Sequence, residues 1–166
     1  LKKRPQNLII GGNIGKNTLT PNSEAIYDYE YCFLKLYDYV DYFVVNVSCP
    51  NISNLSELQD QEMLEGILSR LIEVRASKSI EKPVLLKISP DLNHKQLDET
   101  LKIIEKTRID GIVATNTTIT RNNLVTDKET VINMGNGGLS GRPITERSTE
   151  MIRYIREKAG KELPII

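Results

Sequence analysis

Apolar and polar residues alternate in blocks along this chain, and the blocks predict strands and helices in turn. Short apolar runs with the length of buried strands lie at residues 8–10, 41–47, 84–88 and 109–114. Longer stretches with apolar residues every three or four positions, typical of amphipathic helices, lie at residues 22–40, 61–77, 95–107 and 145–158. Strand–helix units of about 30 to 40 residues predict parallel strands with right-handed crossovers. The sequence therefore predicts an α/β fold, either a barrel or an open doubly wound sheet.

Local signals predict how several elements begin and end. Asn22 or Ser23 is expected to cap the first helix, and Gly160 is expected to end the last one. The apolar run at residues 8–10 is expected to be a strand that leads into a glycine-rich turn. Residues 119–142 predict a long loop, which is uncommon in a compact domain unless it is functional or mobile.

Both ends of the chain read as internal positions. The chain starts with Leu1 rather than with methionine, and residues 163–166 have the pattern of a strand that is only beginning. A strand that stops so early is expected to find no partner. We therefore expect residues 1–166 to be a single domain, truncated at both ends.

Composition and charge narrow the range of functions. The chain has 22 basic and 22 acidic residues, so it lacks the net positive charge that would indicate binding to nucleic acid. No apolar run approaches the roughly 20 residues needed to span a bilayer. Cys32 and Cys49 have neither disulfide nor zinc spacing, no metal site is expected, and Cys32 is best interpreted as a buried, inert thiol. The single histidine, His94, is expected to be solvated rather than catalytic.

Polar and reactive side chains follow the predicted strands at the point where each strand ends. They are Asn13, Asn46, Cys49, Asn51, Lys87, Thr115, Asn116, Thr117 and Ser140. Because the carboxyl ends of parallel strands share one face, these side chains are expected to converge. Amides, hydroxyls, one cation and one thiol suit a planar polar ring, since asparagine donates and accepts in one plane. Two plainer interpretations stay open: an ordinary turn after residues 41–47, and a lysine at position 87 that faces water from an edge strand.

Five segments together resemble the dihydroorotate dehydrogenases, which are FMN-dependent (β/α)8 barrels of pyrimidine biosynthesis. The segments are NIGKN at 13–17, NVSCPN at 46–51, KISPDL at 87–92, TNTT at 115–118 and GGLSGRP at 137–143. Each is weak alone, but they occur in the family's order and at its approximate spacing. The resemblance implies a TIM barrel, of which this chain spans roughly the middle strands to the start of the seventh, and an enzyme that oxidises dihydroorotate to orotate.

The resemblance also implies roles for individual residues. Flavin contacts correspond to Asn13, Asn46, Lys87, Thr115, Ser140 and Gly141. Residues that hold the orotate ring and its carboxylate correspond to Asn46, Asn51, Asn116 and Thr117. Cys49 stands at the position of the catalytic base, which takes a proton from C5 while hydride leaves C6 for the flavin. Lys87 would lie beside the pyrimidine edge of the flavin and stabilise negative charge on its reduced form.

The family divides by its base and its electron acceptor, and this chain resembles both classes. Soluble members typically carry cysteine at the base position, as Cys49 does here, whereas membrane-associated, quinone-reducing members typically carry serine. The flanking segments, including Leu58-Gln59 and Arg142-Pro143, resemble the quinone-linked class. Because several segments outweigh one residue, we favour a quinone acceptor and a peripheral location on the cytoplasmic side of the cell membrane, with membrane contact through parts outside these residues.

Three alternatives stay open at this point. The first is a soluble dihydroorotate dehydrogenase that uses fumarate or NAD as the acceptor. The second is an FMN barrel similar to dihydropyrimidine dehydrogenase, acting on another pyrimidine. The third is a non-catalytic, incomplete barrel, because missing βα units leave open sheet edges; in that case these residues alone would bind FMN weakly or not at all.

Overall fold

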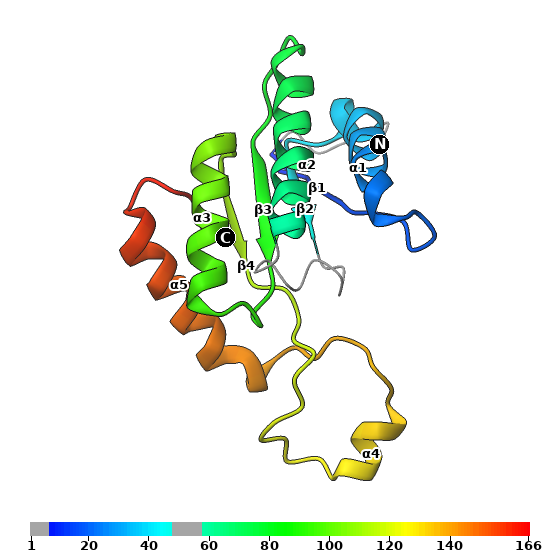
Figure 1. Ribbon diagram of the computed structural model, residues 1–166, viewed down its shortest axis with the longest axis vertical. Coiled ribbons are helices and arrows are strands. Elements are labelled where there is room, and N and C mark those ends of the chain that lie inside the picture. The colour runs from blue at the N-terminus through cyan, green and yellow to red at the C-terminus, as the bar shows by residue number, and fades with distance from the viewer. Residues whose placement is uncertain (1–6, 48–57) are drawn as a thin grey trace.

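A single parallel sheet forms the centre of the molecule (Figure 1). The computed structural model describes residues 7–47 and 58–166. Within these residues the strands are β1 (Gly11–Ile14), β2 (Tyr42–Asn46), β3 (Val84–Ile88) and β4 (Gly111–Ala114). They pair in the order β1-β2-β3-β4, each parallel to the next one in the sequence. The predicted alternation and the parallel pairing are therefore confirmed.

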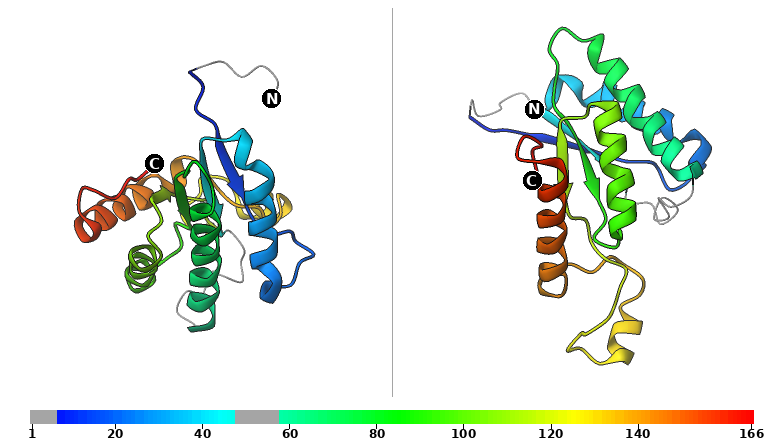
Figure 2. Two further views of the ribbon diagram at one scale, coloured as in Figure 1. Left: turned by 90° about the horizontal axis from the view of Figure 1, so that it is seen from above. Right: turned by 60° about the vertical axis from the view of Figure 1, so that its left-hand side comes forward.

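Helices connect the strands and pack against one side of the sheet (Figure 2). They are α1 (Ala25–Leu36), flanked by the 3-10 turns η1 (Asn22–Glu24) and η2 (Tyr37–Tyr39), then α2 (Leu58–Ala76), α3 (His94–Thr107), α4 (Lys128–Asn133), the 3-10 turn η4 (Arg142–Ile144) and α5 (Thr145–Ala159). The packed helices are α1, α2, α3 and α5, whereas α4 lies in the loop beyond the carboxyl ends of the strands. A doubly wound sheet reverses its strand order and carries helices on both faces. Sequential strands with helices on one side are instead the arrangement of a barrel wall.

The register of the sheet separates an apolar face from a polar one. Side chains of neighbouring positions along a strand point to opposite faces. One set packs with the helices in the main core: Ile14, Phe43, Val45, Val84, Leu86, Ile88 and Ile112. The other set, which we call the helix-free face, consists of Asn13, Tyr42, Val44, Asn46, Leu85, Lys87 and Val113. In a barrel this second face is the interior, and here it changes from apolar to polar toward the carboxyl ends of β2 and β3.

The first strand differs from its prediction. Leu8 and Ile9 are 48% and 75% exposed, and β1 is formed by the glycines that were expected to make a turn. The reason is close packing between strands. A Cβ at Gly11 would lie 2.5 Å from the ring of Tyr42, and one at Gly12 would lie 3.2 Å from Val40. These glycines therefore let β1 approach β2 rather than reverse the chain.

Three further boundary predictions need correction. Neither Asn22 nor Ser23 caps α1 with its side chain, because the chain enters the helix through η1. The long loop at residues 119–142 contains α4, whose first turn is capped by Asp127 accepting from the backbone N–H of Thr130. The final segment does find a partner: Ile166 N donates to Ile112 O at 2.9 Å, which makes residues 164–166 the parallel neighbour of β4.

Candidate active site

The polar end of the helix-free face brings an amide and a cation together. Asn46 is the last residue of β2, and its register partner on β3 is Lys87. Both are half-buried. Apolar side chains precede them on the same face, since Val44 is 8% and Leu85 is 4% exposed. The strands therefore hold two polar side chains side by side at the edge of an apolar floor.

A second amide reaches across from the segment that follows β4. The Nδ2 of Asn116 donates to the Oδ1 of Asn46 at 3.0 Å, so the two amides are joined over the end of β3. The backbone N–H of Asn116 continues the ladder by donating to Ile88 O at 2.8 Å. On the other side, the hydroxyl of Tyr29 donates to the carbonyl of Asn46 at 3.0 Å. These bonds fix the amide planes, and the Nδ2 of Asn46 is left without a partner among the residues described.

Lys87 lies on a central strand, so the idea of an edge lysine facing water is wrong. Its side chain is half-buried, and within residues 7–47 and 58–166 its ammonium makes no hydrogen bond and no ion pair. A partly desolvated cation without a counter-charge is costly. A lysine kept in such a place is suited to an electron-rich group that arrives from outside the chain.

The hydroxyl residues after β4 are arranged around the same end of the sheet. The hydroxyls of Thr115 and Ser148 on α5 lie 2.9 Å apart, so Thr115 is held toward α5. Thr117 is exposed, and its backbone N–H donates to the Oδ1 of Asn116 at 2.8 Å. Thr117 also packs against Gly138, where a Cβ would lie 2.0 Å from its Oγ1. This contact brings the glycine-rich segment against the strand ends.

The other predicted site residues are placed less closely. Asn13 is exposed on β1, on the helix-free face and one strand away from Asn46. Ser140 lines a hollow within the loop at residues 119–143, and Gly141 has a left-handed φ of 85° where the chain enters η4. Cys49 and Asn51 lie outside the described residues. The structure therefore joins Asn46, Lys87 and Asn116 into one group and leaves the remaining assignments as predictions.

Two residue pairs that sequence reasoning missed support this group. Asp91, in the loop after β3, accepts a hydrogen bond from the buried hydroxyl of Thr118. Arg147 on α5 donates to the carbonyls of that same loop. The sequence signal for Asp91 was its place after a strand in Ser89-Pro90-Asp91, a site for a turn; nothing local indicated which residue its carboxylate would meet.

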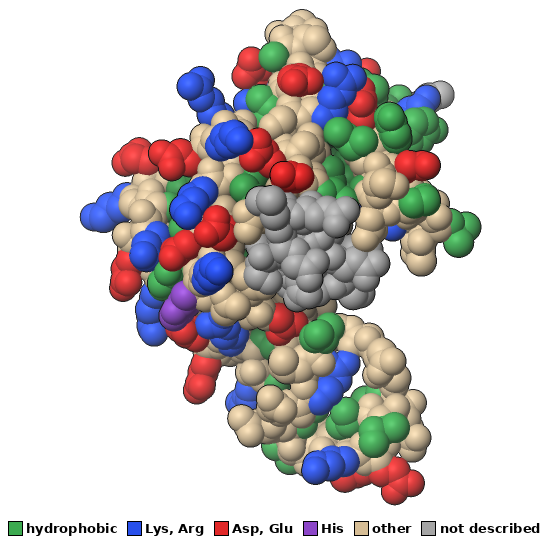
Figure 3. Space-filling model, in the orientation of Figure 1, with side chains coloured by type: hydrophobic (Ala, Val, Ile, Leu, Met, Phe, Trp, Pro, Cys, Tyr) green, Lys and Arg blue, Asp and Glu red, His purple; other side chains and the backbone are tan. Residues whose placement is uncertain are grey.

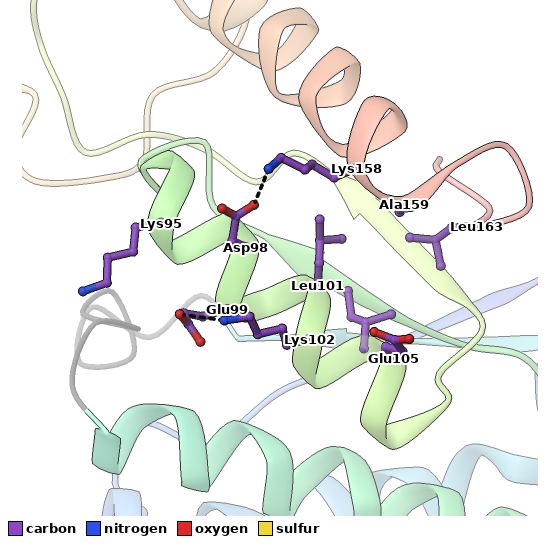
Figure 4. Close-up of a pocket in the computed structure, with 10 residues that line it drawn as sticks. Lys95, Asp98, Glu99, Leu101, Lys102, Glu105, Lys158, Ala159 and Leu163 are labelled. Carbon is purple, nitrogen blue, oxygen red and sulfur yellow. Dashed lines mark hydrogen bonds and ion pairs between the residues drawn. The ribbon is translucent and has the colours of Figure 1, made fainter.

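A separate hollow on the outer surface of the molecule lies between α3 and α5 (Figure 4). Opposite charges meet along it, with Lys158 3.8 Å from Asp98 and Lys102 3.3 Å from Glu99. His94 is exposed nearby and stacks on Tyr154 at 4.2 Å (purple in Figure 3). Charged side chains surround it in Figure 3. This is a charged helix surface, and His94 is exposed on it as expected, with its Nε2 3.4 Å from the Oε1 of Glu150.

Most of the perturbed pKa values among the described residues belong to side chains of the helical layer, and that of Asp127, lowered by hydrogen bonds with Thr130, belongs to the long loop. Burial raises the pKa of the Cys32 thiol, which is half-buried on α1 rather than fully buried as expected. The guanidinium of Arg70 lowers the pKa of Glu30 by a hydrogen bond. No group of three or more His, Cys, Asp or Glu side chains in the described part of the chain could hold a metal ion.

Known proteins resemble this chain over nearly its whole length. The family model described as dihydroorotate dehydrogenase matches residues 1–166. A protein of Christiangramia forsetii named dihydroorotate dehydrogenase (quinone) is 51% identical over 99% of this chain and 47% of its own length. Proteins of Thermobifida fusca and Dichelobacter nodosus with the same name are 40% and 46% identical, over 44% and 49% of their lengths. The chain thus spans about half the length of the curated relatives it matches.

Solved structures confirm the barrel prediction. The ligand-free dihydroorotate dehydrogenase (DHODH) from Eimeria tenella superposes on this chain with a TM-score of 0.83 and 25% identity. The match covers 98% of this chain and 48% of the Eimeria chain. DHODH from the same organism in complex with ferulenol gives a TM-score of 0.81, 26% identity and coverage of 96% and 46%. The sheet and its helices are thus consecutive βα units of a (β/α)8 barrel, and the helix-free face corresponds to the barrel interior.

Proposed function

Because the chain belongs to the dihydroorotate dehydrogenase family, we propose that it forms part of an FMN-dependent barrel that oxidises dihydroorotate to orotate. The resemblance stated from the five sequence segments is confirmed by the family match. We further propose that residues 1–166 are one part of a single barrel domain and that activity needs the rest of it. The family depends on a flavin; FMN is the specific cofactor of the proposal.

One observation supports the proposal above the others: a half-buried lysine, with no partner among residues 7–47 and 58–166, lies beside a fixed pair of amides at the carboxyl end of a barrel wall. The described part of this end offers Lys87 Nζ and Asn46 Nδ2 as donors without partners. Donors of this kind suit the carbonyl oxygens and ring nitrogens of a flavin or an orotate ring. The residues present therefore fit the flavin that the family uses.

When bound, FMN would accept the hydride that leaves C6 of dihydroorotate. Lys87 would hold its positive charge against the electron-rich edge of the ring system, where negative charge develops. Asn13, Asn46 and Thr115 would bind from the strand ends, and Ser140 and Gly141 from the glycine-rich segment.

The substrate would be held by amides and one hydroxyl. Asn46, Asn51, Asn116 and Thr117 would bind the orotate ring and its carboxylate. The bond between Asn116 and Asn46 orients both planes before the substrate arrives, which limits the entropy lost on binding. The Sγ of Cys49 would take the proton from C5, since a thiol has an ordinary pKa of about 8.5 and ionises more readily than an alcohol.

We propose a quinone as the electron acceptor and a peripheral location on the cytoplasmic side of the membrane. The names of the relatives support this class over the soluble one that Cys49 suggests. Within the part of the chain that is described, no helix is both long enough and apolar enough to cross a bilayer.

The test uses the full-length protein that contains these residues, purified with its flavin and mixed anaerobically with substrate. Dihydroorotate should bleach the flavin, whereas dihydrouracil should not, which separates this function from a dihydropyrimidine dehydrogenase-like one. Cys49→Ala should abolish bleaching while the flavin stays bound. A protein bleached by dihydrouracil alone would overturn the proposal, and loss of flavin from Cys49→Ala would mean that Cys49 is structural.

Replacing the thiol by a hydroxyl tests its role as the base. Cys49→Ser should lose turnover at lower pH values where the parent protein is still active, because the serine hydroxyl is harder to deprotonate. The measurement is kcat against pH for both proteins. Superimposable profiles would contradict the assignment of Cys49 as the base.

A further inference from the structure

The loop after β3 is tied to the active-site segments on one side and to a helix on the other. The loop consists of residues 89–93, between β3 and α3. None of the binding or catalytic residues predicted from the sequence lies in it. Its hydrogen bonds nevertheless connect the two segments that carry the predicted substrate and flavin contacts.

The carboxylate of Asp91 makes the first connection. Its Oδ1 accepts from the hydroxyl of Thr118, and its Oδ2 accepts from the backbone N–H of Ile119 at 3.0 Å. Thr118 is only 3% exposed, so this contact is shielded from water although Asp91 itself lies at the surface. Both oxygens of one carboxylate thus hold two successive residues directly after Asn116 and Thr117.

Thr118 passes this constraint on to the glycine-rich segment. Its N–H donates to Leu139 O at 3.0 Å, and the N–H of Leu139 donates back to Thr118 O at 2.8 Å. Leu139 is flanked by Gly138, which packs on Thr117, and by Ser140. The position of the predicted flavin contacts at 140–141 is therefore set relative to the predicted substrate contacts at 116–117 through Thr118.

Arg147 on α5 braces the loop from the opposite side. Its Nε donates to Pro90 O at 3.1 Å and its Nη2 donates to Leu92 O, so the guanidinium holds the carbonyls on both sides of Asp91. The remaining Nη1 pairs with Glu150 at 2.8 Å. In Figure 1 the beginnings of α3 and α5 accordingly lie close together, next to the start of the long loop. The loop that carries Asp91 is thus anchored to α5 on one side and to Thr118 on the other.

We propose that Asp91 is a positioning residue of the active site, anchored by Arg147, which fixes the distance between the substrate segment at 116–117 and the flavin segment at 138–141. The inference rests on the proposed function. Asp91 acts through Thr118 and Ile119, and touches neither ring itself. Asp91 accepts both hydrogen bonds through its one carboxylate, and hydrogen bonds to charged groups contribute more to stability than those between neutral groups.

The test compares variants of the full-length, flavin-loaded protein. Asp91→Ala and Thr118→Val should each weaken orotate binding and raise the KM for dihydroorotate of the flavin-loaded protein about tenfold. The reason is that each variant loses hydrogen bonding between the Asp91 carboxylate and the segment after Thr117. Asp91→Asn keeps one acceptor oxygen and should lie between them and the parent. Thr118→Ser keeps the hydroxyl and should restore binding to within about twofold. Glu105→Gln, an exposed carboxylate on α3, is the control and should change nothing.

A second readout needs no activity. Residues 119–137 contain the tryptic sites Arg121 and Lys128. Cleavage there by trypsin in the flavin-free protein should be about tenfold faster in Asp91→Ala than in the control, because the hydrogen bonds of Asp91 that order the segment, which we call the clamp, are gone. If Asp91→Ala does not fold, Asp91→Asn and Thr118→Val decide. Orotate affinity within twofold of the parent in Thr118→Val and in either Asp91 variant would overturn this inference alone. A parent protein whose flavin dihydroorotate does not bleach would overturn the proposed function as well.

Discussion

Replacing Lys87 with methionine separates a functional role of this lysine from a structural one. Methionine keeps the length and the apolar stem of the side chain and removes only the ammonium. The stem lies on the helix-free face beside the buried Val44 and Leu85, so most of its packing should survive. The change therefore tests the charge alone.

The structure sets the size of both expected effects. Removing one partner of a buried ion pair typically costs about 3–5 kcal/mol, but Lys87 has no such partner among the described residues. The free energy of unfolding of the flavin-free protein should therefore change by less than about 1 kcal/mol, or rise slightly, because a partly desolvated charge is removed. Loss of one group that stabilises developing charge typically slows a reaction by about 10²–10³-fold, or about 2.7–4 kcal/mol.

Two measurements on the full-length protein check these values. Urea unfolding of the flavin-free protein gives the stability, and anaerobic stopped-flow reduction of the bound flavin by dihydroorotate gives the rate. Lys102→Met, on the exposed face of α3, serves as the control and should affect neither. A Lys87→Met protein that loses more than about 2 kcal/mol of stability yet reduces its flavin at the parent rate would mean that Lys87 is structural.

Three further predictions concern the frame around the site. Asp110→Ala removes a carboxylate that accepts a hydrogen bond from a backbone N–H of β3 at 2.7 Å and pairs with an arginine of α2 at 2.5 Å. The change should lower the free energy of unfolding, measured in urea, by about 2–3 kcal/mol. A loss below about 0.5 kcal/mol would contradict this role of Asp110. Gly138→Ala should displace the side chain of Thr117 and raise the KM for dihydroorotate about tenfold, whereas Gly137→Ala, which meets open space, should leave it unchanged. A hydrogen bond from Arg70 on α2 lowers the pKa of Glu30. The contribution of the Glu30 carboxylate to stability is therefore complete above its unfolded pKa of about 4.3, and it is lost as the pH falls through the lower folded pKa. Glu30→Gln should flatten the acid limb of the stability curve, and matching limbs would refute this.

The apolar pattern of the chain determined the order and type of its main elements. Periodicity of two or of three to four residues follows from local backbone geometry, so the runs at 84–88 and 95–107 could be assigned without knowing their neighbours. The polar residues at the strand ends followed from the same logic. Parallel strands place their carboxyl ends together, so Asn46, Lys87 and Asn116 were expected to meet, and they do.

Other features depended on contacts between residues far apart in the chain. Gly11 and Gly12 were expected to form a turn and instead form a strand, because only Tyr42 and its neighbours show that a close approach is needed there. The final residues, 163–166, were expected to lack a partner, yet residues 164–166 pair with the free edge of β4. Local sequence carries no information about which strand will be adjacent.

The clamp at Asp91 shows the same limit within the site itself. A carboxylate after a strand predicts a turn, and its sequence is compatible with many partners. Only the fold brings Thr118 and Arg147, which lie 27 and 56 residues further along, to either side of its loop. The local pattern thus indicated which polar side chains are present at the strand ends. Which residues hold them in place depends on the fold, because hydrogen bonds across such distances form only once the strands and helices have packed.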